Sequence, residues 1–379
     1  MSEYRDTVAY IDTEALCGNY LRLRAEAGEL FCVLKANAYG HGAALCVREL
    51  YLAGARLFAV AELGEALELR RALRKIAGNS RNYRAEILIL GYTNPKHAVI
   101  LEENGFLQTA VSEEHLLALA ATGAKVRVHA AINTGMNRIG LPDNEKSAEL
   151  LLGGRNMGRL RCEGIFTHFY CADQEDGSVT RGQFRRFTEF AGYLGDACGI
   201  RHACNSAAAL RFPEMRLDAC RCGLLLYGLS PCECVKTEGF RQVMRLKSRI
   251  ISLRVAERGE TVGYGGSFVC GRRTLIATVP IGYGDGFLCS YAKGVIPLVN
   301  GYPAPIIGRV CMDMCMLDVT DAALLGSGVS VGDAAEMLPE GGNGVNAAAI
   351  SANSINYEIT TALSARVERR ALTPPREAQ

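Results

Sequence analysis

The sequence predicts a (β/α)8 barrel of the TIM type followed by a smaller β-rich domain. Three observations support this fold class: the chain length, an alternation of apolar runs with helical patterns up to about residue 240, and a change of pattern beyond it. The chain has 379 residues, whereas one α/β barrel takes about 250. We therefore expect the barrel in residues 1–240 and the β-rich domain in residues 241–379.

Eight short apolar runs in the first part of the chain have the length and composition of buried strands. Between them lie amphipathic segments such as AELGEALELRRALRKIAG, in which Leu and Ala recur at three and four positions before a closing Gly. Repeated strand-then-helix units indicate parallel strands in a barrel. The predicted strands are Leu30–Lys35, Leu57–Ala61, Glu86–Leu90, Phe106–Ser112, Val126–Asn133, Leu160–His168, His202–Asn205 and Leu217–Arg221.

The pattern after about residue 240 is different. Segments such as TLIATVPIGYGDGF combine short β-branched runs with Gly and Pro turns, and helical periodicity nearly disappears. This texture predicts a compact β domain of ordinary size. The run Thr7–Ile11 precedes the first barrel helix and could add a strand to either domain.

Composition limits the class of function. Hydrophobic content of 49% and charged content of 22% are typical of globular proteins. The net charge of +2 is spread along the chain, so we expect a small substrate and neither a nucleic acid nor a membrane partner. Charged residues near the start and the lack of a long apolar run favour a cytoplasmic location.

The 15 cysteines do not predict disulfides or a metal site. Most of them lie inside apolar runs, and their number is odd. We expect reduced, buried thiols. The close pairs Cys232/Cys234 and Cys311/Cys315 lack the further ligands of a zinc site, so no metal is expected.

Polar residues stand where several predicted strands end, which is the end of a barrel that carries catalytic groups. They are Lys35, Arg138, His168, Asn205 with Ser206, and Arg221. Each alone has a structural explanation, such as a surface lysine, a core histidine or an ion-paired arginine. Together on one rim they favour a site. A lysine ending a buried strand suits Schiff-base formation, and Ser206 with the backbone near Gly223 and Leu224 could bind a phosphate.

The stretch VLKANAYGHG at residues 33–42 closely resembles the pyridoxal-phosphate (PLP) lysine motif of bacterial alanine racemases. Further blocks resemble the same family in the same order, so the resemblance spans nearly the whole chain. It implies the family's fold, a PLP-binding barrel followed by a β domain. The blocks are TGMNRIG (134–140), EGIFTHF (163–169), NSAA (205–208), RCG (221–223), VGYG (262–265), PIGYGDG (280–286), GRVCMD (308–313) and INYE (355–358).

The resemblance assigns the cofactor contacts residue by residue. It implies that Lys35 holds PLP, that His168 lies beside the pyridine ring and that Arg221 faces the ring nitrogen. Arginine is always charged and only donates, so it leaves that nitrogen unprotonated and the ring a poorer electron sink. This favours reprotonation over side reactions. The remaining implied cofactor contacts are Tyr39, Leu90, Asn205, Ser206, Gly223 and Leu224.

Racemisation needs one group on each face of the α-carbon. The resemblance implies Lys35 for the D-enantiomer and Tyr264 for the L-enantiomer. A tyrosine needs help to act as a base, and neighbouring cations such as His168 or Arg138 could provide it.

The resemblance also implies that Tyr264 comes from a partner subunit, in an obligate homodimer with shared active sites. Met312 would then bind the substrate carboxylate through its backbone alongside Arg138, and Tyr283 would border the entry channel.

The chain departs from its relatives at three positions. Ala131 replaces a carbamylated lysine and Asn133 an aspartate; both lie on one face of a strand, so that region loses negative charge. Arg138 then needs another partner, either a bound chloride or Asn133. Ala365 replaces a tyrosine that touches the phosphate and narrows the entrance, which predicts better acceptance of serine or larger residues.

Interconversion of L- and D-alanine for peptidoglycan is the leading interpretation. A serine or broader-specificity racemase is second within the same chemistry. A PLP decarboxylase or D-threonine aldolase on the same barrel is less favoured, because those relatives lack the Tyr264 block. A non-catalytic PLP-binding protein would resemble the barrel alone.

Overall fold

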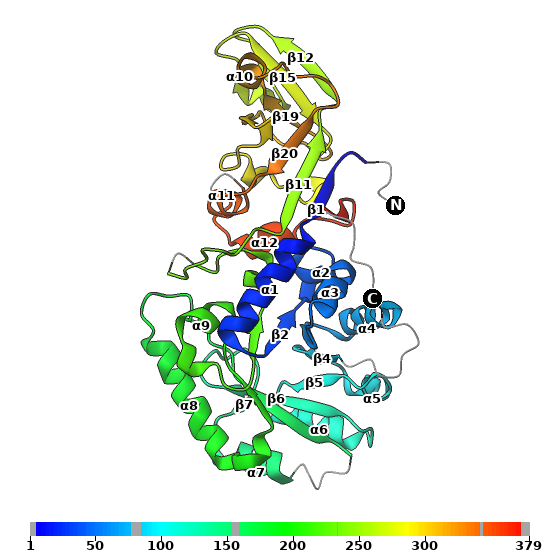
Figure 1. The fold of residues 1–379 in the computed structure, drawn as a ribbon, viewed down its shortest axis with the longest axis vertical. Helices are drawn as coiled ribbons and strands as arrows, with labels where there is room; N and C mark the ends of the chain where they lie inside the picture. The colour runs from blue at the N-terminus through cyan, green and yellow to red at the C-terminus, as the bar shows by residue number, and fades with distance from the viewer. Residues whose placement is uncertain (1–4, 77–84, 154–158, 233, 342–343, 373–379) are drawn as a thin grey trace. The chain divides into compact units, whose positions relative to one another are not determined.

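The structure, a computed structural model, describes residues 5–76, 85–153, 159–232, 234–341 and 344–372. Within these residues the chain divides into two compact units. The barrel unit holds residues 14–38 and 43–241, and the C-terminal unit holds residues 5–13, 39–42 and 242–372 (Figure 1).

The barrel unit is built on eight parallel strands in the order β10-β2-β3-β4-β5-β6-β8-β9. The segments at the two ends of this path are joined by backbone bonds from Arg221 N to Cys204 O (2.8 Å) and from Asp218 N to Arg201 O (3.1 Å). The predicted barrel is therefore confirmed. The strands are β2 (Leu30–Val33), β3 (Leu57–Val60), β4 (Glu86–Ile89), β5 (Leu107–Ala110), β6 (Arg127–Asn133), β8 (Arg161–Phe166), β9 (Ile200–His202) and β10 (Cys220–Cys222), and the short β7 (Leu141–Pro142) pairs with β6.

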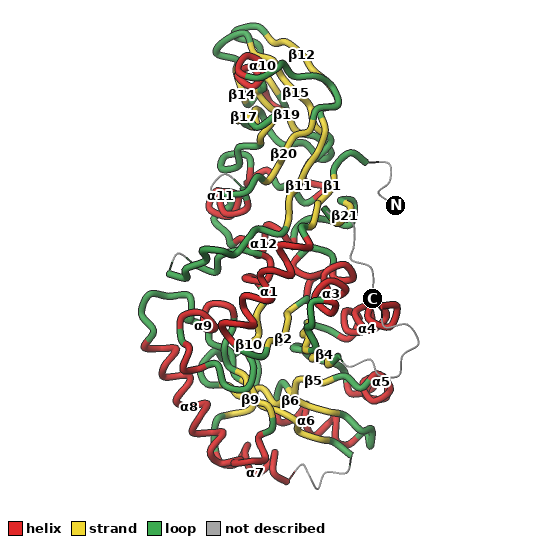
Figure 2. The backbone as a smooth tube through the Cα atoms, in the orientation of Figure 1, coloured by secondary structure: helices red, strands yellow, loops and turns green. Residues whose placement is uncertain are grey.

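Helices follow the strands and surround them (Figure 2). Their ends obey local capping rules: the Ser112 side chain accepts the His115 N–H at the start of α6, and α5 ends at Gly105, which has a φ of 61°. The helices are α1 (Thr13–Ala27), α3 (Ala43–Leu52), α4 (Leu63–Ile76), α5 (Ala98–Asn104), α6 (Glu113–Ala121), α7 (Glu145–Gly153), α8 (Ser178–Leu194) and α9 (Ser206–Arg211), with 3-10 turns η1 (Pro95–His97), η3 (Gly195–Cys198), η4 (Pro213–Met215) and η5 (Leu224–Tyr227).

Three predicted strand boundaries were wrong. The first strand ends at Val33, and Lys35 begins the turn α2 (Lys35–Tyr39) instead. The seventh strand, Ile200–His202, begins two residues before the predicted run and shares only His202 with it. The eighth cannot begin at Leu217, because Leu217 has a φ of 51°, which is incompatible with a strand.

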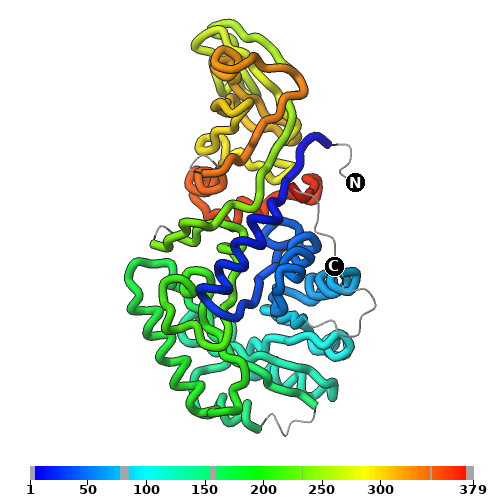
Figure 3. Tube along the Cα trace, viewed as in Figure 1, coloured from blue at the N-terminus to red at the C-terminus, as the bar shows by residue number. Residues whose placement is uncertain are grey.

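Among the described residues, the C-terminal unit contains three sheets, with six, four and two strands. Strand β1 (Val8–Ile11) pairs antiparallel with β11 and parallel with β21, so the run Thr7–Ile11 joins this unit. Figure 3 shows this blue N-terminal segment beside the yellow-green strand β11. The other strands are β11 (Met244–Arg249), β12 (Ser252–Ala256), β13 (Thr261–Val262), β14 (Phe268–Val269), β15 (Thr274–Val279), β16 (Leu298–Val299), β17 (Tyr302–Pro303), β18 (Ile306–Ile307), β19 (Cys315–Asp318), β20 (Ala334–Leu338) and β21 (Glu368–Ala371).

Short helices complete this unit. They are α10 (Thr320–Leu325), α11 (Val345–Ser351) and α12 (Asn356–Thr361), with 3-10 turns η6 (Tyr264–Gly266), η7 (Tyr283–Asp285) and η8 (Cys289–Tyr291).

All 15 cysteines are free thiols. Among the described residues, no group of three or more His, Cys, Asp or Glu side chains is placed to hold a metal ion. In the same parts of the chain, no helix has the length and apolar character that crossing a bilayer requires.

Candidate active site

Lys35 lies just beyond the end of β2, next to two arginines. Burial lowers the pKa of its amine, and the positive charges of Arg138 and Arg221 lower it further, against a smaller opposing effect of Glu65. A lowered pKa increases the neutral fraction of the amine at physiological pH. The neutral amine is the form that attacks a carbonyl carbon, so Lys35 is prepared for Schiff-base chemistry.

The backbone after Lys35 forms a left-handed turn. Residues 36–39 have φ values between 51° and 57°, although none of them is glycine. The turn is held by the Ala38 N–H, which donates to Leu34 O (2.9 Å), and by the Ala36 N–H, which donates to Glu65 Oε1 (2.6 Å). Left-handed backbone is unfavourable for L-residues, and such strain persists where surrounding contacts impose it, commonly at functional sites.

Arg221 is buried on the barrel strand β10 and donates to several acceptors. Nη1 donates to His202 Nδ1 (2.9 Å) and to His202 O (2.7 Å). Nη2 donates to Thr167 O (2.7 Å), Ala203 O (3.1 Å) and His168 Nδ1 (3.3 Å). Burial lowers the pKa of Arg221 to about 10, so the guanidinium remains charged at neutral pH.

The protonation state of His168 follows from this contact. Burial and the charges of Arg221, Arg138 and Lys35 hold its pKa well below the usual histidine value. His168 is therefore neutral at physiological pH, with the proton on Nε2, because Nδ1 accepts from Arg221. The expectation that His168 would assist Tyr264 as a cation is corrected, because burial and nearby positive charge disfavour the charged form of its ring.

Ser206, Asn205 and Gly223 form a polar cluster where α9 and η5 begin. The Asn205 side chain accepts the Ala208 N–H (3.0 Å), which caps the helix, and donates to Phe169 O (3.1 Å). The buried Ser206 hydroxyl accepts the Gly223 N–H (3.0 Å), one residue before η5 begins at Leu224. A hydroxyl and backbone N–H groups at the starts of two helical turns are suited to an anion.

Arg138 borders a small cavity of about 20 Å³, with room for roughly one water-sized species. Ala131, Asn133, Thr167 and His168 also line it.

Asn133 is engaged elsewhere. Its Oδ1 accepts the N–H groups of Gly135 (3.1 Å) and Asn137 (3.0 Å), and its Nδ2 donates to Asn137 Oδ1 (2.9 Å). Among the residues that the structure describes, Arg138 makes no hydrogen bond or ion pair. Of the two partners considered for Arg138, Asn133 is therefore ruled out.

In the C-terminal unit, Tyr264 stands at the tip of the β13–β14 hairpin and is 70% exposed. Val262 anchors this hairpin in an apolar cluster with Cys270, Ile276 and Ile307. Gly263 has a φ of 80°, and a Cβ there would lie 3.1 Å from Arg309 N, so the turn requires glycine. The hairpin base is fixed while the phenol projects outward.

Tyr283 and Met312 lie on two loops joined by backbone hydrogen bonds. The Tyr283 N–H donates to Cys311 O (3.0 Å) and the Gly284 N–H donates to Met312 O (2.8 Å). Both side chains are exposed.

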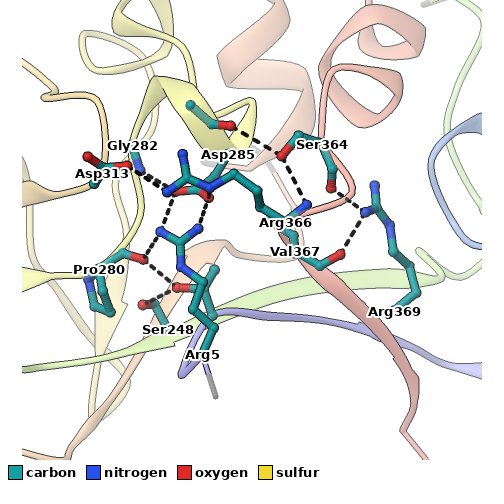
Figure 4. A network of polar contacts seen from close by, with 12 residues as sticks. Arg5, Ser248, Pro280, Gly282, Asp285, Asp313, Ser364, Arg366, Val367 and Arg369 are labelled. Carbon is teal, nitrogen blue, oxygen red and sulfur yellow. Dashed lines mark hydrogen bonds and ion pairs between the residues drawn. The ribbon is translucent and has the colours of Figure 1, made fainter. Parts of the chain in front are cut away.

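A network of charges supports these loops (Figure 4). The fully buried Asp285 carboxylate accepts from both Nη atoms of Arg5 and from the Gly282 N–H (3.0 Å), and it lies 3.3 Å from Arg366 Nε. Arg366 Nη2 also donates to Asp313 Oδ1 (2.6 Å). The exposed Ala365 directly precedes this arginine. The sequence analysis did not identify Arg5 or Asp285, whose partners are distant in the chain.

Sequence reasoning also missed His129 and His202. Both are fully buried, on β6 and β9, and His129 Nδ1 lies 2.8 Å from His202 Nε2. The signal was a histidine inside each of two apolar strands. Leu90 directly follows β4, and Tyr39 ends the left-handed turn.

The fold and these groups define a class: a barrel enzyme with a lysine prepared to attack a carbonyl, a buried hydroxyl that can donate to an anion, and a buried arginine. The alanine racemase N-terminal domain profile matches residues 11–231 and the C-terminal domain profile matches residues 243–371. The chain belongs to the alanine racemase family.

Individual relatives agree with this assignment. The chain is 38% identical to the alanine racemase of Desulfovibrio desulfuricans, over 96% of this chain and 98% of that protein. It is 36% identical to the alanine racemase of Clostridium perfringens strain SM101, over 96% of this chain and 95% of that protein.

Solved structures of alanine racemases share this fold at somewhat lower sequence identity. The alanine racemase of E. faecalis superposes with a TM-score of 0.88 at 32% identity, over 98% of this chain and 99% of that one. The Bacillus anthracis alanine racemase with bound L-Ala-P superposes with a TM-score of 0.84 at 31% identity, over 96% of this chain and 94% of that one. The Bartonella henselae alanine racemase with covalently bound pyridoxal phosphate superposes with a TM-score of 0.83 at 26% identity, over 97% of this chain and 99% of that one.

Proposed function

We propose that this protein is a PLP-dependent alanine racemase that interconverts L- and D-alanine with Lys35 and Tyr264 as its two proton-transfer groups. The observation that carries the proposal is the Lys35 amine, whose pKa is lowered by burial and by Arg138 and Arg221, at the rim of a barrel whose family match extends over nearly the whole chain.

The residues at the rim fit PLP. Lys35 supplies an amine whose lowered pKa raises its neutral fraction, and the buried Ser206 hydroxyl, which accepts the Gly223 N–H, keeps its own proton to donate to the phosphate. PLP bound here provides a ring that spreads the negative charge left on the α-carbon when its proton leaves. Arg221 would face the ring nitrogen with donors only, and His168, whose pKa is held well below its usual value, would lie beside the ring. Tyr39, Leu90, Asn205 and Leu224 complete the proposed set of contacts.

Each base acts on one face of the α-carbon. Lys35 Nζ moves the proton of the D-enantiomer and Tyr264 Oη that of the L-enantiomer. The high exposure of Tyr264 in a single chain supports its delivery to a second subunit, so we propose a homodimer in which each site uses two chains.

Arg138 and the Met312 backbone bind the substrate carboxylate, and Tyr283 borders the entrance. The absence of a protein partner for Arg138 among the described residues supports this role, because its guanidinium remains available to an anion such as a carboxylate or chloride. We place the enzyme in the cytoplasm, where it supplies D-alanine for peptidoglycan.

A second candidate is a serine or broader-specificity racemase. It is favoured by Ala365, an exposed residue whose side chain ends at Cβ where relatives have a phenol. Comparing kcat/KM for L-Ala and L-Ser in the wild type and in Ala365→Tyr decides between them. If the enzyme is a serine or broader-specificity racemase, the ratio of kcat/KM for L-Ser to kcat/KM for L-Ala should fall in Ala365→Tyr. An unchanged ratio contradicts this candidate.

The proposed activity is tested by incubating the PLP-loaded protein with L-alanine in D2O. We expect deuterium at the α-carbon together with D-alanine. Binding of PLP to Lys35 without any exchange would instead identify a non-catalytic PLP-binding protein.

A further inference from the structure

The roles assigned above do not use His129, one of the buried histidines. His129 on β6 is fully buried, and its ring packs edge-on against the Phe31 ring, with 6.0 Å between the ring centroids. A Cβ at Gly164 on the neighbouring strand β8 would lie 2.7–2.8 Å from the His129 ring atoms Cε1 and Nε2. Glycine at 164 therefore leaves the space in which the ring stands, and the ring has little freedom to move.

His129 is the last member of a chain of hydrogen bonds with a defined direction. Arg221 only donates, so His202 Nδ1 accepts and carries no proton. A neutral His202 must then carry its proton on Nε2, which donates to His129 Nδ1 at 2.8 Å. His129 in turn carries its proton on Nε2, which has no hydrogen-bond partner among the described residues.

Neutral rings are required along this chain. Burial is the largest cause that lowers the pKa of both histidines, followed by nearby positive charge that includes Arg221; the pKa of His129 falls to about 3. The guanidinium of Arg221 is thus the one charge among these three groups.

We propose that His129 is a positioning residue for the cofactor ring: by accepting the Nε2–H of His202, it keeps the Nδ1 lone pair of His202 on Arg221 and so holds Arg221 toward the pyridine nitrogen. This role rests on the proposed function, because it is Arg221 that faces PLP. His129 itself touches neither cofactor nor substrate.

Removal of the acceptor has a defined consequence. Without His129 Nδ1, the buried Nε2–H of His202 loses its partner, and a buried donor without a partner is costly. His202 then gains by rotating or changing tautomer, and either change withdraws an acceptor from Arg221. Nη1 retains only the His202 carbonyl, so the arginine loses part of its orientation.

The test uses two variants of similar size. His129→Asn keeps an acceptor oxygen near the position of Nδ1, whereas His129→Leu has none. The first measurement is the ring ¹⁵N spectrum of the cofactor-free protein, labelled at its six histidines and assigned by His202→Gln and His129→Asn. The second is kcat/KM for alanine in the PLP-loaded enzymes, and the third is thermal unfolding.

In the wild type we expect both rings neutral, with Nε2 protonated and Nδ1 unprotonated. In His129→Leu we expect the His202 signals to shift toward a tautomer mixture and kcat/KM to fall roughly ten-fold, about 1.4 kcal/mol, with most of the loss recovered in His129→Asn. A proton on His202 Nδ1 in the wild type overturns the proposal. So do unchanged His202 signals in His129→Leu, or equal losses in both variants, since a purely structural role lowers the melting temperature without changing the tautomer. A wild type that binds no PLP contradicts the proposed function alone, because the tautomers are read without cofactor.

Discussion

The left-handed turn after Lys35 makes an unusual prediction: replacing alanine by glycine should stabilise the protein. Ala36 is exposed, with φ 51° and ψ 52°. An L-residue pays about 1–2 kcal/mol for this conformation, a cost that glycine avoids. Glycine loses about 0.5–1 kcal/mol more conformational entropy on folding than alanine. The net effect of Ala36→Gly is a gain of about 0.5–1 kcal/mol in the free energy of unfolding.

The control is an exposed alanine in ordinary helix. Ala118 lies in the middle of α6, and Ala118→Gly should cost about 1 kcal/mol. Urea unfolding of the cofactor-free protein, followed by far-ultraviolet circular dichroism, measures both changes. The two variants must move the midpoint in opposite directions; a similar loss of stability in both would refute the left-handed turn and the strain attributed to it.

The remaining predictions concern charge and packing. Asp285→Asn should lower the free energy of unfolding by about 2–4 kcal/mol, because it removes the buried negative charge that pairs with the guanidinium groups of Arg5 and Arg366. The exposed control Asp313→Asn should cost less than about 1 kcal/mol. Equal midpoints of urea unfolding in the two variants would contradict this prediction. Arg138→Ala should change the unfolding free energy by less than about 0.5 kcal/mol yet raise KM for alanine, and it should move the pH dependence of PLP attachment to higher pH, because one cause of the lowered Lys35 pKa is gone. The folded pKa of Lys35 lies below its unfolded value, so the folded state binds fewer protons and the free energy of unfolding rises with pH from the lowered pKa to about 10.5. This contribution to stability is lost as pH falls through the folded pKa. Lys35→Met should therefore flatten the rise of the free energy of unfolding, measured by urea unfolding at several pH values between those limits.

Much of the barrel was predictable because strands buried on both faces read as continuous apolar runs. The eight runs were found, and the strand ends placed Lys35 and Arg221 on one rim. The turn after Lys35 was not predictable, since Ala36 and Ala38 carry no sequence signal for a left-handed backbone. That conformation is imposed by tertiary contacts such as the one to Glu65.

Other features depended on contacts between distant residues. Arg5 and Asp285 are 280 positions apart, so no local pattern links them. The lowered pKa of His168 depends mainly on burial and then on nearby positive charge, which a single sequence does not display. Tyr264 was identified only through the family resemblance, because an exposed tyrosine in a hairpin has no feature of its own that marks a base.

The central claim, that Lys35 of one chain works with Tyr264 of another, is tested most directly by mixing two inactive variants. Lys35→Ala and Tyr264→Phe are each purified, mixed, dissociated and reassociated with PLP, and racemisation of L-alanine is measured. In a heterodimer, one site combines the intact lysine of one chain with the intact tyrosine of the other, so random pairing should restore roughly a quarter of wild-type activity. If both groups of a site came from the same chain, no mixture would contain an intact site. Activity that stays at the level of the separate variants would therefore contradict the account.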